Sequence, residues 1–249
     1  MQLSVTFNKE KIFLPIATTE TIQGLLYRAV GVGDAEYFED VHDTGSVLGK
    51  RKYKLFSFSE LKGKYIVEDK KIIYLSDAIL EIRSANAYFI QLMHQYFLTN
   101  STVMLGSNEV RVSDVVLTDE IIFDSEVKIR TLSPITVYST DASGYTRFYS
   151  PMEEGFYKAV EMNARRKWMS VYKSDEDFSF SIEPTENKHY VKRATKFKST
   201  YITAWHGSFV LKGSPKVLNF LFNTGLGVKN SQGFGMFEVI PKRLNPKQP

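Results

Sequence analysis

The stretch Gly225-Leu226-Gly227-Val228-Lys229-Asn230-Ser231-Gln232-Gly233-Phe234-Gly235 carries four glycines in eleven residues. A short helical pattern comes before it, and an apolar strand-like segment, residues 236–240, comes after it. Glycine reaches left-handed backbone angles at little cost, so the loop can present several backbone N–H groups in one concavity that suits phosphate. The order helix, loop, strand excludes a P-loop and a dinucleotide fingerprint. A glycine-rich hairpin or helix end without a ligand is the alternative interpretation.

The composition is that of a soluble globular chain of one or two domains, since 43% of its 249 residues are hydrophobic and 24% are charged. The net charge of +4 permits a polyanionic partner without requiring one. The absence of cysteine excludes disulfides and thiolate metal sites. No apolar run reaches the length of a membrane span, and residues 1–7 alternate like a strand and not like a signal peptide. We therefore expect a cytoplasmic protein with no membrane partner.

Hydrophobic periodicity divides the chain into two halves with the same order of elements. In each half a strand is followed by a helix, further strands, a second helix and a last strand. Such split βαβ units in series predict an α+β fold of two tandem ferredoxin-like (βαββαβ) domains, residues 1–120 and residues 121–249. The expected helices begin after an N-cap at Thr18 or Thr19, at residues 85 and 153, and after an N-cap at Ser214. The expected strands include residues 2–8, 53–59, 72–82, 126–132, 178–182, 191–198 and 201–211.

The four histidines, His42, His94, His189 and His206, do not have the spacing of a metal site. We therefore expect no metal and no cofactor. His42 differs from the others because Asp40 and Asp43 flank it in a loop followed by cations. A histidine that titrates near neutral pH is suited to general acid or base catalysis. The alternative interpretation, which the spacing alone favours, is an ordinary surface histidine.

Basic residues alternate with aromatic residues in three segments, 50–54, 188–193 and 196–198. On strands or hairpins such segments can hold a sugar–phosphate backbone and stack bases. Each segment taken alone also fits a solvated charged face. Together with the glycine loop they favour an RNA partner. The candidate RNA-binding residues here are Lys50, Arg51, Lys52, Lys192, Arg193 and Lys196.

The glycine-rich stretch resembles the C-terminal motif of the CRISPR-associated repeat-processing endoribonucleases, which belong to the repeat-associated mysterious protein superfamily. Other segments match in the same order along the chain. They are Gly24-Leu25-Leu26-Tyr27, His42 after a short helix, Lys54-Leu55-Phe56-Ser57-Phe58-Ser59, Leu132-Ser133-Pro134-Ile135 and Thr203-Ala204-Trp205-His206. The resemblance thus extends over nearly the whole chain and implies ferredoxin-like domains.

The resemblance implies metal-independent cleavage of precursor CRISPR RNA within its repeats, by 2′-hydroxyl attack that leaves a 2′,3′-cyclic phosphate and a 5′-hydroxyl. It implies that His42 is the general acid or base, that Tyr27 orients or deprotonates the nucleophile, and that Lys54 stabilises the transition state, with Lys50 or Lys52 as alternatives. The loop would shape the RNA site between the domains through Gly225, Gly227, Lys229, Asn230, Ser231, Gly233 and Gly235.

Two other functions remain open at this point. The first is a non-catalytic subunit that binds CRISPR RNA within an interference complex. The second is a small-molecule phosphate-binding module that uses the glycine loop alone. The expected partners are CRISPR repeat RNA, a CRISPR effector complex and a second copy of the chain in a homodimer.

Overall fold

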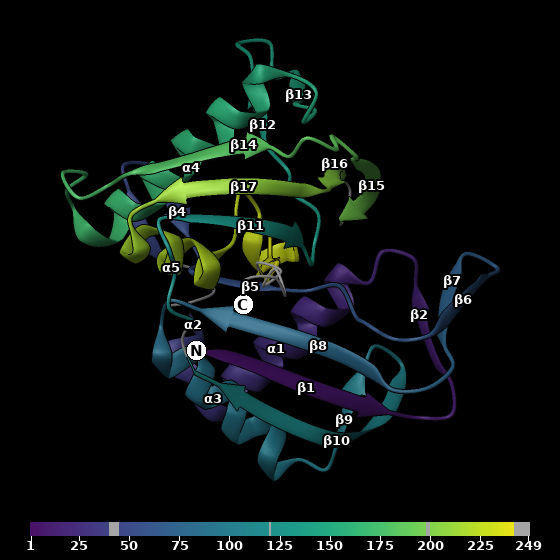
Figure 1. Ribbon diagram of the computed structural model, residues 1–249. Coiled ribbons are helices and arrows are strands. Elements are labelled where there is room, and N and C mark those ends of the chain that lie inside the picture. The colour runs from purple at the N-terminus through teal and green to yellow at the C-terminus, as the bar shows by residue number, and fades with distance from the viewer. Residues whose placement is uncertain (40–44, 120, 198–199, 242–249) are drawn as a thin grey trace, which may run out of the picture.

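The structure is a computed structural model, and it describes residues 1–39, 45–119, 121–197 and 200–241. Two antiparallel sheets lie one above the other, each with helices packed on it (Figure 1). The helices are α1 (Thr19–Gly33), α2 (Ala35–Glu39), α3 (Ala87–Thr99), α4 (Glu154–Tyr172), α5 (Pro215–Thr224) and the short 3-10 helix η2 (Asn230–Gln232).

The strands of the first half are β1 (Gln2–Asn8), β2 (Ile12–Pro15), β3 (Ser46–Leu48), β4 (Arg51–Tyr53), β5 (Phe56–Phe58), β6 (Tyr65–Glu68), β7 (Lys71–Tyr74), β8 (Ala78–Ser84), β9 (Thr102–Leu105) and β10 (Asn108–Thr118). The strands of the second half are β11 (Glu126–Thr131), β12 (Tyr138–Thr140), β13 (Thr146–Phe148), β14 (Phe180–Pro184), β15 (Val191–Phe197), β16 (Thr200–His206), β17 (Ser208–Gly213) and β18 (Phe237–Val239).

Both main sheets have the same ferredoxin-like topology. The first has the strand order β5-β8-β1-β10-β9, and the second has the order β14-β17-β11-β18. In each, the first strand of the unit lies between the third and the fourth, and the helices connect them as β1-α1-β5-β8-α3-β10 and β11-α4-β14-β17-α5-β18. The predicted α+β fold of two tandem βαββαβ units is confirmed.

Alternating burial explains why each sheet can carry helices. Strand β1 buries Leu3, Val5 and Phe7, and Val5 pairs with Leu80 on one side and Val115 on the other. Helix α1 turns the apolar residues of its i, i+3, i+4 pattern onto this sheet. A separate buried cluster, formed mainly by β11, α4, β17 and α5, fills the second half.

Four expectations about local structure are corrected. The expected strand 53–59 is interrupted, because β4 ends at Tyr53 and β5 begins only at Phe56. The expected strand 72–82 is likewise divided into β7 and β8, which end and begin at Tyr74 and Ala78. The expected strand 201–211 is divided at Gly207, where an added Cβ would lie 2.5 Å from the ring of Tyr190. Thr18 makes no capping hydrogen bond at the start of α1. The expected Ser214 cap is confirmed, since its side chain accepts a hydrogen bond from the Val217 amide.

A buried arginine joins the two halves. Arg83 of β8 is 2% exposed, donates a hydrogen bond to the Phe237 carbonyl of β18, and places its guanidinium carbon 3.6 Å from the centre of the Phe222 ring. Burial lowers the pKa of Arg83 to about 9. In the described part of the chain, no helix is long and apolar enough to cross a membrane.

Candidate active site

The glycine loop lies between the two halves and is built around Asn230. The Asn230 side chain is 6% exposed, and its Nδ2 donates to the carbonyls of Leu226 at 2.9 Å and Phe234 at 3.0 Å. At Gly235, where φ is +77°, an added Cβ would lie 1.9 Å from the Leu226 carbonyl oxygen. The chain therefore crosses itself at a distance that only glycine allows.

Helix α4 holds this loop from behind through Lys167. The Lys167 Nζ donates to Asn230 Oδ1 at 2.6 Å, to the Gly225 carbonyl at 2.7 Å and to the Thr224 carbonyl at 3.3 Å. Burial lowers the pKa of Lys167 to about 7. An ammonium has three donors, so these three acceptors use all of them.

The expectation of a concave row of free loop amides is corrected. Many of the loop's backbone N–H groups donate to carbonyl oxygens within the chain. They are those of Gly225, Leu226, Val228, Gln232, Gly233 and Gly235. Positive charge at this site therefore comes chiefly from side chains.

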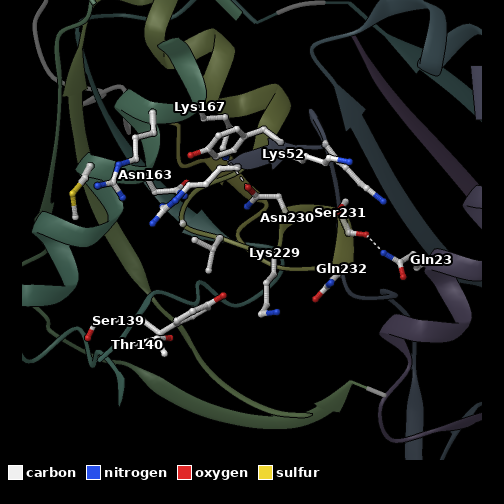
Figure 2. A pocket seen from close by; sticks show the side chains of 18 residues that line it. Gln23, Lys52, Ser139, Thr140, Asn163, Lys167, Lys229, Asn230, Ser231 and Gln232 are labelled. Atoms are coloured by element: carbon white, nitrogen blue, oxygen red, sulfur yellow. Dashed lines mark hydrogen bonds between the residues drawn. The ribbon is translucent and has the colours of Figure 1, made fainter. Parts of the chain in front are cut away.

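The other side of the loop contacts α1. Gln23 Nε2 donates to the Ser231 carbonyl at 2.6 Å (Figure 2). At Gly233 an added Cβ would lie 2.7 Å from the Phe58 ring and 2.9 Å from the Thr19 methyl group. The loop thus connects α4 of the second half to α1 and β5 of the first.

Tyr27 and Lys54 form a hydrogen-bonded pair beside the loop. Lys54 Nζ donates to Tyr27 Oη at 2.8 Å and lies 5.0 Å from the centre of the Tyr27 ring. The ring is held edge-on by Phe38 and Phe56 at centroid distances of 5.9 and 6.1 Å. Burial raises the pKa of Tyr27 to about 12, although a hydrogen bond with the Ser231 side chain acts in the opposite direction. Tyr27 is therefore a neutral phenol at physiological pH.

The β3–β4 hairpin carries the basic segment 50–54 across to α4. Ser46 Oγ donates to the Ser170 carbonyl at 2.9 Å, and Lys173 Nζ donates to the Val47 carbonyl at 3.4 Å. Because both contacts join the hairpin to the C-terminal part of α4, Arg51 and Lys52 are brought to the second half of the molecule.

These elements enclose a cavity of about 700 Å³ (Figure 2). Among the described residues that line it there is no aspartate or glutamate. Half-burial in this cavity lowers the pKa of Lys229, whose Nζ lies 5.9 Å from the centre of the Tyr138 ring. Such a cavity attracts an anion. Its cationic side chains are Arg51, Lys52, Lys54, Arg166, Lys167 and Lys229.

The structure brings together part of the predicted site. Lys54 bonds to Tyr27, and the cavity is lined by the predicted residues Arg51, Lys52, Gly227, Lys229, Asn230 and Ser231. His42 lies outside the described residues. Lys50 is exposed and does not line the cavity, nor do the exposed Lys192, Arg193 and Lys196 of β15. Gly225, Gly233 and Gly235 are buried and set the path of the loop. Their predicted contacts with RNA stay predictions.

Sequence reasoning missed the contribution of α4. Asn163, Arg166 and Lys167 have the i, i+3, i+4 spacing of one helix face, and all three line the cavity. The run Arg165-Arg166-Lys167 was a visible signal. Gln23, which shares a helix face with Tyr27 one turn away, was another.

Comparison with protein families and curated proteins gives one consistent result. Residues 117–239 match the family model of CRISPR associated protein Cas6, C-terminal. The chain is 27% identical over 244 residues to the CRISPR-associated endoribonuclease Cas6 of Pyrococcus furiosus, covering 93% of this chain and 86% of the relative. It is 28% identical over 209 residues to the CRISPR-associated endoribonuclease Cas6 1 of Methanocaldococcus jannaschii, covering 80% of this chain and 81% of the relative.

Solved structures share the fold over nearly the whole chain. A Cas6-related protein from Pyrococcus furiosus superposes with a TM-score of 0.82 at 20% identity, covering 98% of this chain and 99% of the other. An RAMP protein described as binding different RNA substrates superposes with a TM-score of 0.81 at 21% identity, covering 97% of this chain and 100% of the other.

Proposed function

We infer the function of this chain from the family to which it belongs, the CRISPR-associated Cas6 endoribonucleases: it cleaves precursor CRISPR RNA within its repeats. The observation that carries the assignment of the site is the Tyr27–Lys54 pair, which lies beside a cavity with cationic side chains and no carboxylate among its described lining residues. A phosphodiester that enters this cavity would meet the Lys54 ammonium group, which is hydrogen-bonded to the Tyr27 phenol.

We propose that the 2′-oxygen of the nucleotide before the cut forms a bond to phosphorus while the bond from phosphorus to the 5′-oxygen breaks. The 2′-hydroxyl proton passes to a base and a proton reaches the leaving 5′-oxygen. The products are a 2′,3′-cyclic phosphate and a 5′-hydroxyl. Lys54 supplies positive charge to the phosphorane, so the proposed reaction needs no metal.

Tyr27 orients the nucleophile in this proposal and does not deprotonate it. A pKa of about 12 makes the phenolate rare at neutral pH. Lys54 donates to the phenol oxygen and thereby fixes the position of the phenol beside the cavity. This favours the orienting role over the basic one.

We assign proton transfer to His42. The described residues on either side of it are held next to the Tyr27–Lys54 pair. Phe38 packs on the Tyr27 ring, and Gly45 lies so close to Tyr53 that an added Cβ would be 2.7 Å from the Tyr53 carbonyl oxygen. These contacts of the flanking residues support the assignment.

The test uses purified protein and end-labelled repeat RNA from its host, in excess EDTA, with a parallel substrate that carries a single 2′-deoxy group at the cut. We expect one cut that persists in EDTA and is absent from the deoxy substrate. His42→Ala should abolish cleavage and leave RNA binding intact, whereas the control His189→Ala, in an exposed loop, should cut like the wild type. Normal cleavage by His42→Ala would remove His42 from the mechanism.

Tight binding of repeat RNA without any cut would instead support a non-catalytic RNA-binding subunit. We propose repeat RNA as the partner and the cytoplasm as the location, with transfer of the product to an effector complex and a homodimer as further proposals. The separate buried clusters of the two halves support the proposed division into residues 1–120 and 121–249.

A further inference from the structure

Helix α4 brings an unused amide to the wall of the cavity. Asn163 is 7% exposed, and its buried Oδ1 has no hydrogen-bond partner in the part of the chain that the structure describes. Within the described residues its amide nitrogen has no partner either. Lys167, one turn along, directs its donors to the glycine loop and not to Asn163. A buried amide that the protein leaves unpaired needs an explanation, and a ligand that enters the cavity supplies one.

Arg166 is the second unused group on this helix face. It lines the same cavity and forms no hydrogen bond or ion pair with the described part of the chain. Its neighbour Arg165 differs, because its guanidinium pairs with Asp175 at 2.6 Å and stacks on Phe178. The two arginines thus separate into one held by the protein and one left for a ligand.

An amide and a guanidinium on one helix face suit the two parts of a nucleotide. An asparagine side chain donates and accepts side by side, and adenine offers the complementary acceptor and amino group on more than one edge. A guanidinium pairs with phosphate oxygens. The ring of Tyr138, which lines the same cavity beside Lys229, adds a surface on which a base can stack.

We propose that α4 forms a nucleotide subsite in which Asn163 selects an adenine next to the cut and Arg166 binds the phosphate of that nucleotide. This proposal rests on the proposed function and gives it a source of sequence selectivity. Asn163 is then a specificity residue that touches the substrate.

The experiment uses a panel of repeat RNAs in which each of the positions flanking the mapped cut carries all four bases in turn. Dissociation constants and single-turnover cleavage rates are measured for the wild type, Asn163→Ala and Asn163→Leu, the second of which keeps the side-chain size. The wild type should favour adenosine at one position by about tenfold or more. Replacing that adenosine with purine riboside, which lacks the amino group, should remove the advantage. Both variants should lose the preference and still bind and cut.

Stability provides an independent readout. Because the described structure gives the Asn163 amide no partner, both variants should melt no lower than the wild type, whereas a structural role would lower the melting temperature. Arg166→Ala should weaken RNA binding and reduce the slope of log Kd against log salt by about one, while the matched control Arg165→Ala should change neither.

Failure of the proposed subsite and failure of the proposed function give different experimental results. Wild-type cleavage with unchanged base preference in Asn163→Ala overturns the subsite and leaves the proposed function intact. RNA binding without cleavage removes the proposed function, and the base preference of binding then still decides whether Asn163 selects adenine.

Discussion

Replacing Lys167 with methionine should loosen the glycine loop. Methionine fills a similar space but donates no hydrogen bond. The substitution would leave Asn230 Oδ1 and the carbonyls of Gly225 and Thr224 without the donor that each has now. All three acceptors lie in the buried interior between α4 and the loop.

The magnitude follows from two opposing effects. An acceptor left unsatisfied in the interior costs about 1–3 kcal/mol, and three are affected. Removing the buried ammonium recovers part of its desolvation penalty. The net result should be a loss of about 2–4 kcal/mol in the free energy of unfolding. Lys158→Met, on the exposed part of the same helix where Lys158 pairs with Glu154, should leave the free energy of unfolding nearly unchanged, because a solvent-exposed ion pair contributes little.

The substitution should also change the pH dependence of stability. The folded pKa of Lys167, about 7, lies below the ordinary value of 10.5, so between these values the unfolded chain binds the proton more strongly than the folded chain. The free energy of unfolding therefore rises with pH from about 7 towards 10.5, where folding no longer buries a charge. Lys167→Met should lack this rise.

Urea denaturation at several pH values measures both effects, and hydrogen exchange locates them. The amides of Leu226 and Gly235, which donate to the carbonyls of Gly235 and Pro134 at 2.8 and 2.9 Å, should lose protection in the variant, while those of β1 keep theirs until global unfolding. A variant as stable as the wild type at neutral pH, with loop protection unchanged, would refute the role given to Lys167.

Other substitutions test the site and its support. Gly235→Ala should destabilise the protein by roughly 2–4 kcal/mol, whereas Gly144→Ala, which has a positive φ but no atom within 4 Å of the added Cβ, should cost about 1 kcal/mol in thermal denaturation. Arg83→Met should lower the free energy of unfolding by about 3 kcal/mol, because the Phe237 carbonyl loses its charged donor. Tyr27→Phe should reduce single-turnover cleavage about 100-fold through loss of orientation with an unchanged melting temperature, since the contacts of its ring remain; an unchanged rate would exclude the phenol from the mechanism.

Most of the fold could be predicted from periodicity. Strand β1 has the bounds expected from its alternation, and α1 buries the apolar residues that its spacing indicated. The breaks in the strands could not be predicted in the same way. At Gly207 the chain divides where the Tyr190 ring approaches, and that ring comes from a segment whose position depends on the tertiary fold.

The residues of the site could likewise be predicted only in part. A resemblance of motifs pointed to Tyr27 and Lys54, which the structure places in contact. Lys167 stands in a basic run in the middle of a helix, a pattern typical of a solvated face. Its burial depends on the loop that folds against α4 some 60 residues later in the chain. A similar remote partner explains why Asn230, a polar loop residue in the sequence, is an internal support in the structure.

The glycines of the loop are therefore important because they allow the loop to make close contacts. Their positive φ angles let the loop cross itself and lie against Phe58 and Thr19 without side chains in the way, and this close approach places Ser231 beside Gln23 and Tyr27. On its other side the loop is fixed to α4 by Lys167. The position of Tyr27 relative to the cationic wall of the cavity is thus set jointly by both halves of the chain. It follows that a substitution in α4 can reduce cleavage without touching RNA, and that such an effect should appear together with lost protection of the loop amides. A substitution at Asn163, by contrast, should alter base preference and leave those amides protected.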